Sequence, residues 1–385
     1  MSAQWLYTKT EWNMIRGRGI AEDNFAHESR TNLEILIREA LQNPLDARAG
    51  SSGPVRVTLR KLEKSSINSS YFKKILNDEF LERLKASIEG SQSLDPNIPT
   101  ALVVEDFGTS GLEGNFANPD AEGDGENWNA FWYSEGEGAK ATKGSNGRAG
   151  QGKITYYRAS AARAVFGLTV RANDQKRLLM GRSAFRRAYK FKEAKYVQYA
   201  FWCVNDNQRS MPMENAIEID EFRTAFQIKR TNEPGLSLVV PFPGDFEVNE
   251  AIRVVLSEFY FPIASGQLEV SVGDVDITAL NVSSLSDIHL LESMIAQKGP
   301  FCSKGFRTFI ADVVAEMQSG KQLPQLNAGW EKASQLGAES FPEGVLEQIR
   351  KRVEEGQRVS MRCPVAVKSK KAGIHSTFFD IHLQV

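Results

Sequence analysis

The segment over residues 29–47 constrains the fold most, because it combines an amphipathic pattern with polar residues at fixed spacing. Apolar residues recur there at helical spacing and form one stripe: Leu33, Leu36, Ile37, Ala40 and Leu41. We predict a helix over residues 29–43, capped by Ser29 and ended by Pro44. Glu39 and Asn43 are four residues apart and therefore share one helix face, with Asp46 beside them.

This spacing of a carboxylate and an amide suits phosphoryl transfer. Glu39 can orient and deprotonate a water molecule, and the amide oxygen of Asn43 can ligate Mg²⁺. The alternative is a surface helix with ordinary polar residues, because a Glu and an Asn at this spacing are common.

A second polar segment follows an apolar strand predicted over residues 101–104. The strand runs into Asp106 and then into Gly108 and Gly111. A carboxylate at a strand end can accept a hydrogen bond from the exocyclic amine of adenine, and glycines let the backbone approach the base closely. A glycine-rich turn without a ligand is the alternative.

A third segment, GSNGRAGQGK over residues 144–153, is rich in glycine. Successive backbone N–H groups before a helix start form an anion site for phosphates. The glycine order differs from that of a dinucleotide-binding loop. A P-loop is excluded because Ile154 stands where the hydroxyl ligand is needed and no strand precedes the loop.

These three segments, in this order, resemble the GHKL ATPase family: gyrase B subunits, MutL mismatch-repair proteins, heat-shock chaperones of that class, MORC proteins and histidine kinases. REALQNPLDA is similar to the N-box of the family. The resemblance implies that Glu39 is the general base, that Asn43 is the Mg²⁺ ligand and that Asp46 supports the phosphate–metal site.

The other boxes extend the resemblance. EDFGTSGL is similar to the D-x-G-x-G box, which implies that Asp106 binds the adenine amine beside Gly108, although Gly111 comes one position late. The lid motif, with residues 112–152 as the lid, is matched by Gly147, Gly150 and Gly152, followed by Lys153. GLSLVV resembles the late strand whose hydroxyl, usually from Thr, touches the adenine-site water, and this implies that role for Ser237.

The implied fold is α/β: a Bergerat-type sandwich over residues 1–245, in which helices cover a mixed, mostly antiparallel sheet. A second, transducer-like α+β domain is expected over residues 246–385. In the first domain the sequence patterns predict a strand over 55–62, a helix over 71–89, a helix start over 153–163 and strands within 164–241. In the second they predict helices over 248–261, 287–297, 305–319 and 344–356, a hairpin over 267–279, and strands over 359–367 and 376–384.

The second region offers one further candidate group. Transducer domains of gyrase-like and MutL-like proteins send a lysine to the γ-phosphate, and Lys368, Lys370 or Lys371 would take this role. A solvated turn is the alternative. The chain stays strand-like to its last residues, so we expect that a further domain follows or that the chain is a shortened form.

Residues 176–195 are basic and carry interleaved aromatic residues, Phe185, Tyr189 and Phe191. Such a tract can follow a nucleic-acid backbone, but the wet face of a hairpin is the favoured interpretation.

The composition sets outer limits. Lys and Arg number 47 and Asp and Glu 48, so the net charge of −1 gives no general attraction to nucleic acid or anionic membranes. The three cysteines are far apart, the N-terminus lacks a secretory signal, and no apolar run approaches the roughly 20 residues of a membrane span. We expect a cytoplasmic protein without a membrane partner.

Chain length and box order favour the gyrase, MutL, chaperone and MORC branch over a histidine kinase, since His27 lies too close to the N-box. The resemblance then implies a molecular clamp or switch. ATP with Mg²⁺ closes the lid and joins two chains into a homodimer, and slow hydrolysis reopens it. DNA or a protein would be the partner, in DNA maintenance or bacterial antiviral defence. The alternative is a nucleotide-binding interaction module, or a chaperone-like protein, with little turnover.

Overall fold

A computed structural model of the chain describes residues 2–11, 30–48, 53–87, 94–121, 123, 125–134, 154–185, 187–290, 303–332, 335–369 and 373–384. The chain divides into two compact units. The first contains residues 1–140 and 146–291, and the second contains residues 141–145 and 292–385.

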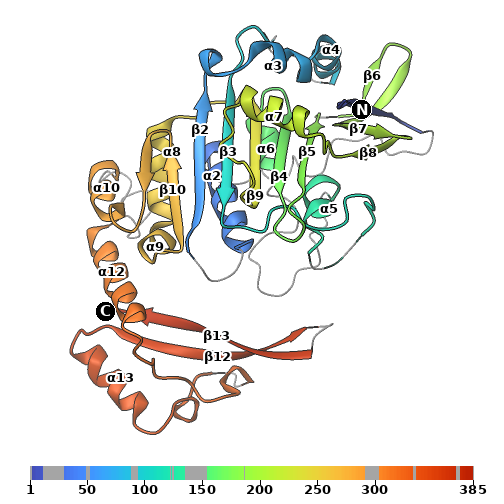
Figure 1. The fold of residues 1–385 in the computed structure, drawn as a ribbon. Helices are drawn as coiled ribbons and strands as arrows, with labels where there is room; N and C mark the ends of the chain where they lie inside the picture. Colours follow the sequence, from blue (N-terminus) through green and yellow to red (C-terminus); the bar gives the residue numbers. More distant parts are fainter. Residues whose placement is uncertain are drawn as a thin grey trace. The chain divides into compact units, whose positions relative to one another are not determined.

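The first unit is built on a mixed sheet that contains eleven of the described strands (Figure 1). Their bounds are β1 (Gln4–Lys9), β2 (Val55–Leu62), β3 (Ala101–Phe107), β4 (Ala164–Val170), β5 (Arg177–Ala184), β6 (Tyr189–Phe191), β7 (Ala194–Asp206), β8 (Arg209–Met211), β9 (Gly235–Pro241), β10 (Leu268–Val272) and β11 (Val275–Ile277). The order is β1-β7-β5-β4-β9-β3-β2-β10-β11, and β6 and β8 also pair with β7. Among these strands β2 and β10 pair in parallel and the other pairs are antiparallel, which confirms the predicted sheet type.

Helices pack on both faces of this sheet. The described ones are α2 (Asn32–Asp46), α3 (Ser69–Ile75), α4 (Asp78–Ser87), α5 (Asn127–Trp132), α6 (Ile154–Ala159), α7 (Ala216–Ala225), α8 (Val248–Glu258), α9 (Tyr260–Ala264) and α10 (Val282–His289). One face carries α3, α4 and α7 over a core that includes Ala101 and Val103 of β3. Because strand side chains alternate, Asp106 points to the opposite face, where α2 and α6 pack against the sheet.

Helix α2 forms as predicted in its middle but not at its ends. Thr31 caps it through a capping box: its hydroxyl accepts from the Glu34 amide at 3.1 Å, and the Thr31 amide donates to the Glu34 carboxylate at 2.8 Å. The predicted cap, Ser29, lies outside the described residues. The predicted end at Pro44 is wrong, because the proline falls in the last turn and the helix continues to Asp46.

Two other predicted helices have different bounds. The helix expected over residues 71–89 is broken into α3 and α4, because the side chain of Asn77 accepts from the Phe80 amide at 2.9 Å and starts a new helix. The helix expected over residues 287–297 overlaps α10, which begins at Val282 and ends at His289, and residues 291–297 of that range lie outside the described residues. The hairpin predicted over residues 267–279 is confirmed, with Val272 and Val275 paired across its turn.

The two units divide after Leu291, whereas the sequence led us to expect a domain boundary after residue 245. The difference has a direct cause in strand pairing. Leu268–Val272 extends the large sheet, because β10 pairs with β2 from Leu268↔Val55 to Val272↔Leu59.

The second unit contains α12 (Lys304–Gln318), α13 (Val345–Glu354) and a long hairpin of β12 (Val359–Ser369) and β13 (Gly373–Leu383). These helices and strands fall within the α+β region that was expected over residues 246–385. The hairpin carries a bidentate ion pair, in which Arg362 donates to Asp380 at 2.8 and 2.9 Å.

Candidate functional site

The polar face of α2 presents the three residues of the first box. Asn43 Nδ2 donates to Glu39 Oε2 at 3.2 Å, so the pair is in contact. Glu39 is half-buried, whereas Asn43 and Asp46 are exposed. Partial burial raises the pKa of the Asp46 carboxyl. The opposite side of the helix is apolar and buried, so packing fixes which face these oxygen-bearing groups present.

Asp106 lies near the end of β3, a strand whose residues are all buried. Its Oδ1 accepts from Thr109 Oγ1 at 2.5 Å and from the Leu236 amide at 3.1 Å. Among the described residues Oδ2 has no hydrogen-bond donor. Burial raises the pKa of this carboxyl, and the charge of Arg230 acts against the rise. Asp106 is therefore a fixed, buried acceptor with one oxygen still available.

The turn after β3 joins this strand to the end of α2. The Ser110 amide donates to the Ala47 carbonyl at 3.2 Å, and Arg48 and Thr109 form an isolated antiparallel bridge. The Ala172 amide donates to the Ser110 carbonyl at 2.9 Å. The structure thus brings the first and second boxes together through backbone hydrogen bonds.

Gly111, the glycine that comes one position late, has a steric role in this turn. Its φ is +71°, and an added Cβ would lie 2.3 Å from the Val170 carbonyl oxygen and 2.7 Å from Thr169 Oγ1. The Thr169 hydroxyl in turn accepts from the Leu112 amide at 2.9 Å and donates to the Gly235 carbonyl at 2.8 Å. The turn is therefore packed directly against β4 and the start of β9.

Tyr156 on α6 is a site residue that the sequence did not reveal. Burial raises the pKa of this phenol, and the negative charges of Glu39 and Asp106 raise it further. One carboxylate from each of the first two boxes therefore acts electrostatically on this buried phenol. Its signal in the sequence was weak, because an aromatic residue in a short helix is usually only part of the core.

Ser237 does not lie where the resemblance implied. It pairs with Glu105 across β9 and β3, so its side chain is on the face opposite to the Asp106 carboxylate. Its Oγ donates to Glu105 Oε1 at 3.0 Å and accepts from Arg230 Nε at 2.9 Å. The structure therefore does not bring this hydroxyl to Asp106.

Several expected site residues fall outside the described residues: Gly147, Gly150, Gly152, Lys153, Lys370 and Lys371. The side chain of Lys368 is likewise not described. The first part of the expected lid is described and it is folded. It contains α5, whose Trp128 and Trp132 are fully buried in a hydrophobic cluster with Leu178 and Phe201.

The basic tract over residues 176–195 does not form one accessible face. Phe185 and Tyr189 are buried in the core, and Arg182 is also buried. Arg177 donates to Asp220 at 2.6 Å. Two of the three interleaved aromatic residues are therefore inside the fold, and the third, Phe191, is half-buried.

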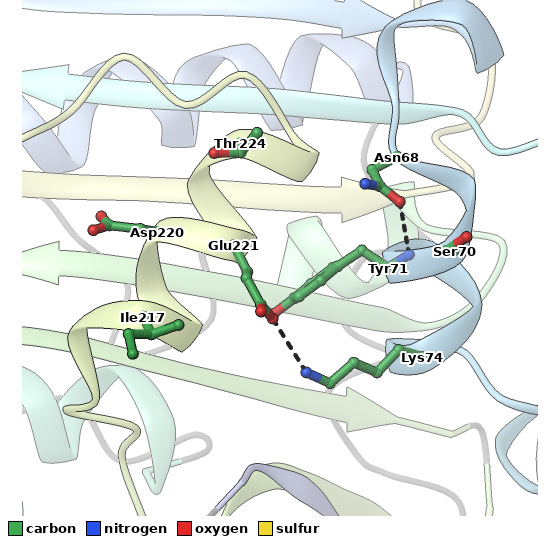
Figure 2. A pocket seen from close by; sticks show the side chains of 8 residues that line it. All are labelled: Asn68, Ser70, Tyr71, Lys74, Ile217, Asp220, Glu221 and Thr224. Atoms are coloured by element: carbon green, nitrogen blue, oxygen red, sulfur yellow. Dashed lines mark hydrogen bonds and ion pairs between the residues drawn. The ribbon is translucent and has the colours of Figure 1, made fainter.

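A surface hollow lies between α3 and α7 and has its charged groups already paired (Figure 2). Its lining comprises Asn68, Ser70, Tyr71, Lys74, Ile217, Asp220, Glu221 and Thr224. Lys74 forms an ion pair with Glu221 at 3.5 Å. The hollow is on the face of the sheet opposite to Asp106, so it is separate from the site on α2 and β3.

Two crystal structures of the ATPase region of Saccharomyces cerevisiae topoisomerase II are similar to this chain, one of them bound to ICRF-187 (dexrazoxane). Sequence identities are 14% and 12%, and the TM-score is 0.31 for each. The alignments cover 66% of this chain and 51% and 50% of those chains, so they span about half of each topoisomerase chain. No family model matches the chain, and no curated protein is similar to it in sequence.

The large mixed sheet with its helices, together with the second small sheet, has the α/β architecture that was expected from the sequence. The chemistry of the site is a separate question, which depends on the contacts of the chain's own residues.

Within the described part of the chain, none of the helices has the length and apolar character that a membrane span requires.

Proposed function

We propose that this chain binds ATP with Mg²⁺ and hydrolyses it slowly. One observation carries the proposal: the turn after Asp106 is hydrogen-bonded to the end of α2, the helix on which Glu39 and Asn43 are in contact. The helix α2 thereby supplies a general base and a metal ligand, and the adjoining end of β3 supplies a hydrogen-bond acceptor for adenine. This is the set of groups that phosphoryl transfer to water requires.

Each residue has a role that fits its contacts. Asp106 accepts a hydrogen bond from the adenine amine at Oδ2, because Oδ1 already accepts from Thr109 and Leu236. Glu39 orients the attacking water and takes its proton. The resemblance assigns phosphate binding to the glycine-rich segment that contains Gly147, Gly150, Gly152 and Lys153.

The residues on α2 fit a magnesium ion. Mg²⁺ prefers oxygen ligands and retains waters and phosphates as the others. Asn43 holds its Nδ2 against Glu39, so its Oδ1 is the atom left to ligate the ion, and the exposed Asp46 carboxylate can support it. When bound, the ion would neutralise phosphate charge and orient the phosphate chain.

ATP acts in this proposal as a conformational ligand as well as a substrate. Lid closure and pairing of two chains into a clamp follow ATP binding, and slow closure limits turnover. The clamp works in the cytoplasm on DNA or on a protein, in DNA maintenance or antiviral defence. A binding module with little turnover is the competing function.

The test compares Glu39→Gln with a matched control, Glu82→Gln, which changes an exposed helical glutamate on α4. We expect Mg²⁺-dependent ATP hydrolysis by the wild type, a rate lower by about 100- to 10,000-fold in Glu39→Gln, and no change in the control. ATP binding to Glu39→Gln should be retained. A wild type that binds ATP without any Mg²⁺-dependent turnover would favour the binding module instead.

A further inference from the structure

We propose that Arg230 positions Asp106 for base recognition and thereby sets the selectivity for adenine. This inference rests on the proposed function, because it assumes that Asp106 reads the base. Arg230 lies in the loop between α7 and β9 and touches no proposed ligand-binding atom directly.

Arg230 is fully buried and uses its guanidinium to hold the backbone around Asp106. Its Nη2 donates to the Asp106 carbonyl and, at 3.0 Å, to the Leu236 carbonyl. Leu236 is also the residue whose amide donates to Asp106 Oδ1 at 3.1 Å. One guanidinium group therefore fixes both the strand that carries the carboxylate and the strand that orients it.

Arg230 is itself held from the other face of the sheet. Glu105 is fully buried and accepts from the Lys229 amide at 3.1 Å, the Arg230 amide at 3.2 Å and Ser237 Oγ at 3.0 Å. Arg60 closes the outer end of the network with a bond to Glu105 at 2.8 Å. Since Glu105 and Asp106 are neighbours on opposite faces of β3, the network on one face determines the geometry on the other.

Gly235 shows how closely these groups approach one another. Its φ is +138°, and an added Cβ would lie 2.5 Å from the Asp106 carbonyl oxygen and 2.7 Å from both Arg230 Nη1 and Asp106 Oδ1. No side chain fits between the guanidinium and the carboxylate. The arrangement is therefore built around this arginine, and lysine cannot replace it, because one ammonium cannot reach acceptors distributed around a planar group.

The network also favours the ionised form of the Asp106 carboxylate, which is the form that accepts a hydrogen bond from the adenine amine. The charge of Arg230 opposes the rise in the pKa of Asp106 that burial causes, although burial also lowers the pKa of the Arg230 guanidinium itself. Loss of the guanidinium would leave Asp106 both less fixed and less readily ionised.

The experiment is a double-mutant cycle on ATP affinity with Arg230→Lys, Asp106→Asn and the pair. We expect Arg230→Lys to weaken ATP binding by about tenfold, as for hydrogen bonds to charged groups. In the Asp106→Asn background the same change should alter affinity by less than about twofold, because its effect acts through Asp106. Equal effects in both backgrounds would overturn the inference.

Nucleotide selectivity provides the readout that a purely structural role would not move. GTP carries a carbonyl where adenine carries its amine, so Arg230→Lys should lower the ratio of ATP to GTP affinity. An unchanged ratio would show that Arg230 only stabilises the fold. The matched control is Arg177→Lys, whose guanidinium binds Asp220 instead, and it should change neither affinity nor ratio.

The remaining outcomes separate this inference from the proposed function. If the wild type does not bind ATP, or if Asp106→Asn binds it equally well, the proposed function fails. If Arg230→Lys does not fold, Arg60→Gln perturbs the same network from its outer end, on the face of the sheet opposite to the Asp106 carboxylate. A weakening of about threefold that disappears in Asp106→Asn would then support the inference, and any other result would overturn it.

Discussion

The Ser110 amide and the Ala47 carbonyl are hydrogen-bonded at 3.2 Å, and this bond joins the turn after Asp106 to the end of the helix that carries Glu39. Two segments about sixty positions apart in the sequence are thereby held next to each other. Because this connection is made by backbone atoms, substitutions that move the backbone should weaken it more than substitutions of the side chains of Ala47 or Ser110.

Gly111→Ala is expected to destabilise the first unit strongly. The new Cβ would lie 2.3 Å from the Val170 carbonyl oxygen, at a φ of +71°. Gly266→Ala is the matched control, since its φ is +73° and nothing lies within 4 Å of the added atom. We expect a loss of about 1 kcal/mol for the control, from backbone strain alone, and clearly more for Gly111→Ala. Equal losses in urea unfolding would contradict the close approach.

Asp106→Asn is expected to weaken ATP binding by about 10- to 100-fold while leaving the fold intact. The asparagine oxygen can still accept from Leu236 and Thr109, but its amide nitrogen would face the adenine amine and cannot accept from it. Asp274→Asn, at the exposed turn between β10 and β11, is the control. Calorimetric titration with ATP measures both, and unchanged affinity in Asp106→Asn would refute the assignment.

The sequence predicted the parts of this site that depend on local pattern. Glu39 and Asn43 share a helix face because of their spacing alone, and their contact at 3.2 Å agrees with that prediction. Asp106 is a buried acceptor because it ends an apolar strand that becomes a central strand of the sheet.

The parts that depend on register and distant contacts were not predictable. The face to which Ser237 points is set by its pairing with Glu105, and a single sequence does not reveal such a pairing. Arg230 lies in an irregular loop, and its importance comes from bonds to backbone atoms of other strands. The position of Tyr156 depends on the packing of α6 beside α2, which is a tertiary contact that the sequence does not reveal.

Arg83→Met is expected to destabilise the edge of the sheet where β1 lies. The Arg83 guanidinium carbon is 3.9 Å from the ring centre of Tyr7, 4.1 Å from that of Phe191 and 4.3 Å from that of Tyr196. Three cation–π contacts at a buried position suggest a loss of about 2–4 kcal/mol in the free energy of unfolding.

Glu79→Gln is the control for this change, because Glu79 binds the same arginine but is half-exposed and should contribute less than about 1 kcal/mol. Hydrogen exchange should show faster opening of the amides of Gln4–Lys9 in Arg83→Met only. Unchanged exchange there would show that β1 is held by its backbone pairing with β7 and by the contacts of Trp5, without a contribution from Arg83.

ATP affinity is expected to fall as the pH is lowered from neutral. The fall should begin above pH 3.8, the ordinary pKa of an Asp carboxyl. Burial raises the pKa of Asp106, so protonation, which removes the acceptor for the adenine amine, begins at a higher pH than for an exposed carboxyl. The effect on stability has the opposite sign. Above pH 3.8 the unfolded chain has released this proton while the folded chain still holds it, so stability falls as the pH rises through the raised pKa.

The Asp106→Asn variant cannot titrate at this position, so it separates the two effects. Its ATP affinity should be weak and constant over the same pH range, and its stability relative to the wild type should improve from acidic to neutral pH. ATP titrations and urea unfolding at matched pH values measure both quantities. A wild-type affinity that is constant down to the ordinary Asp range would mean that Asp106 is not the group that reads the base.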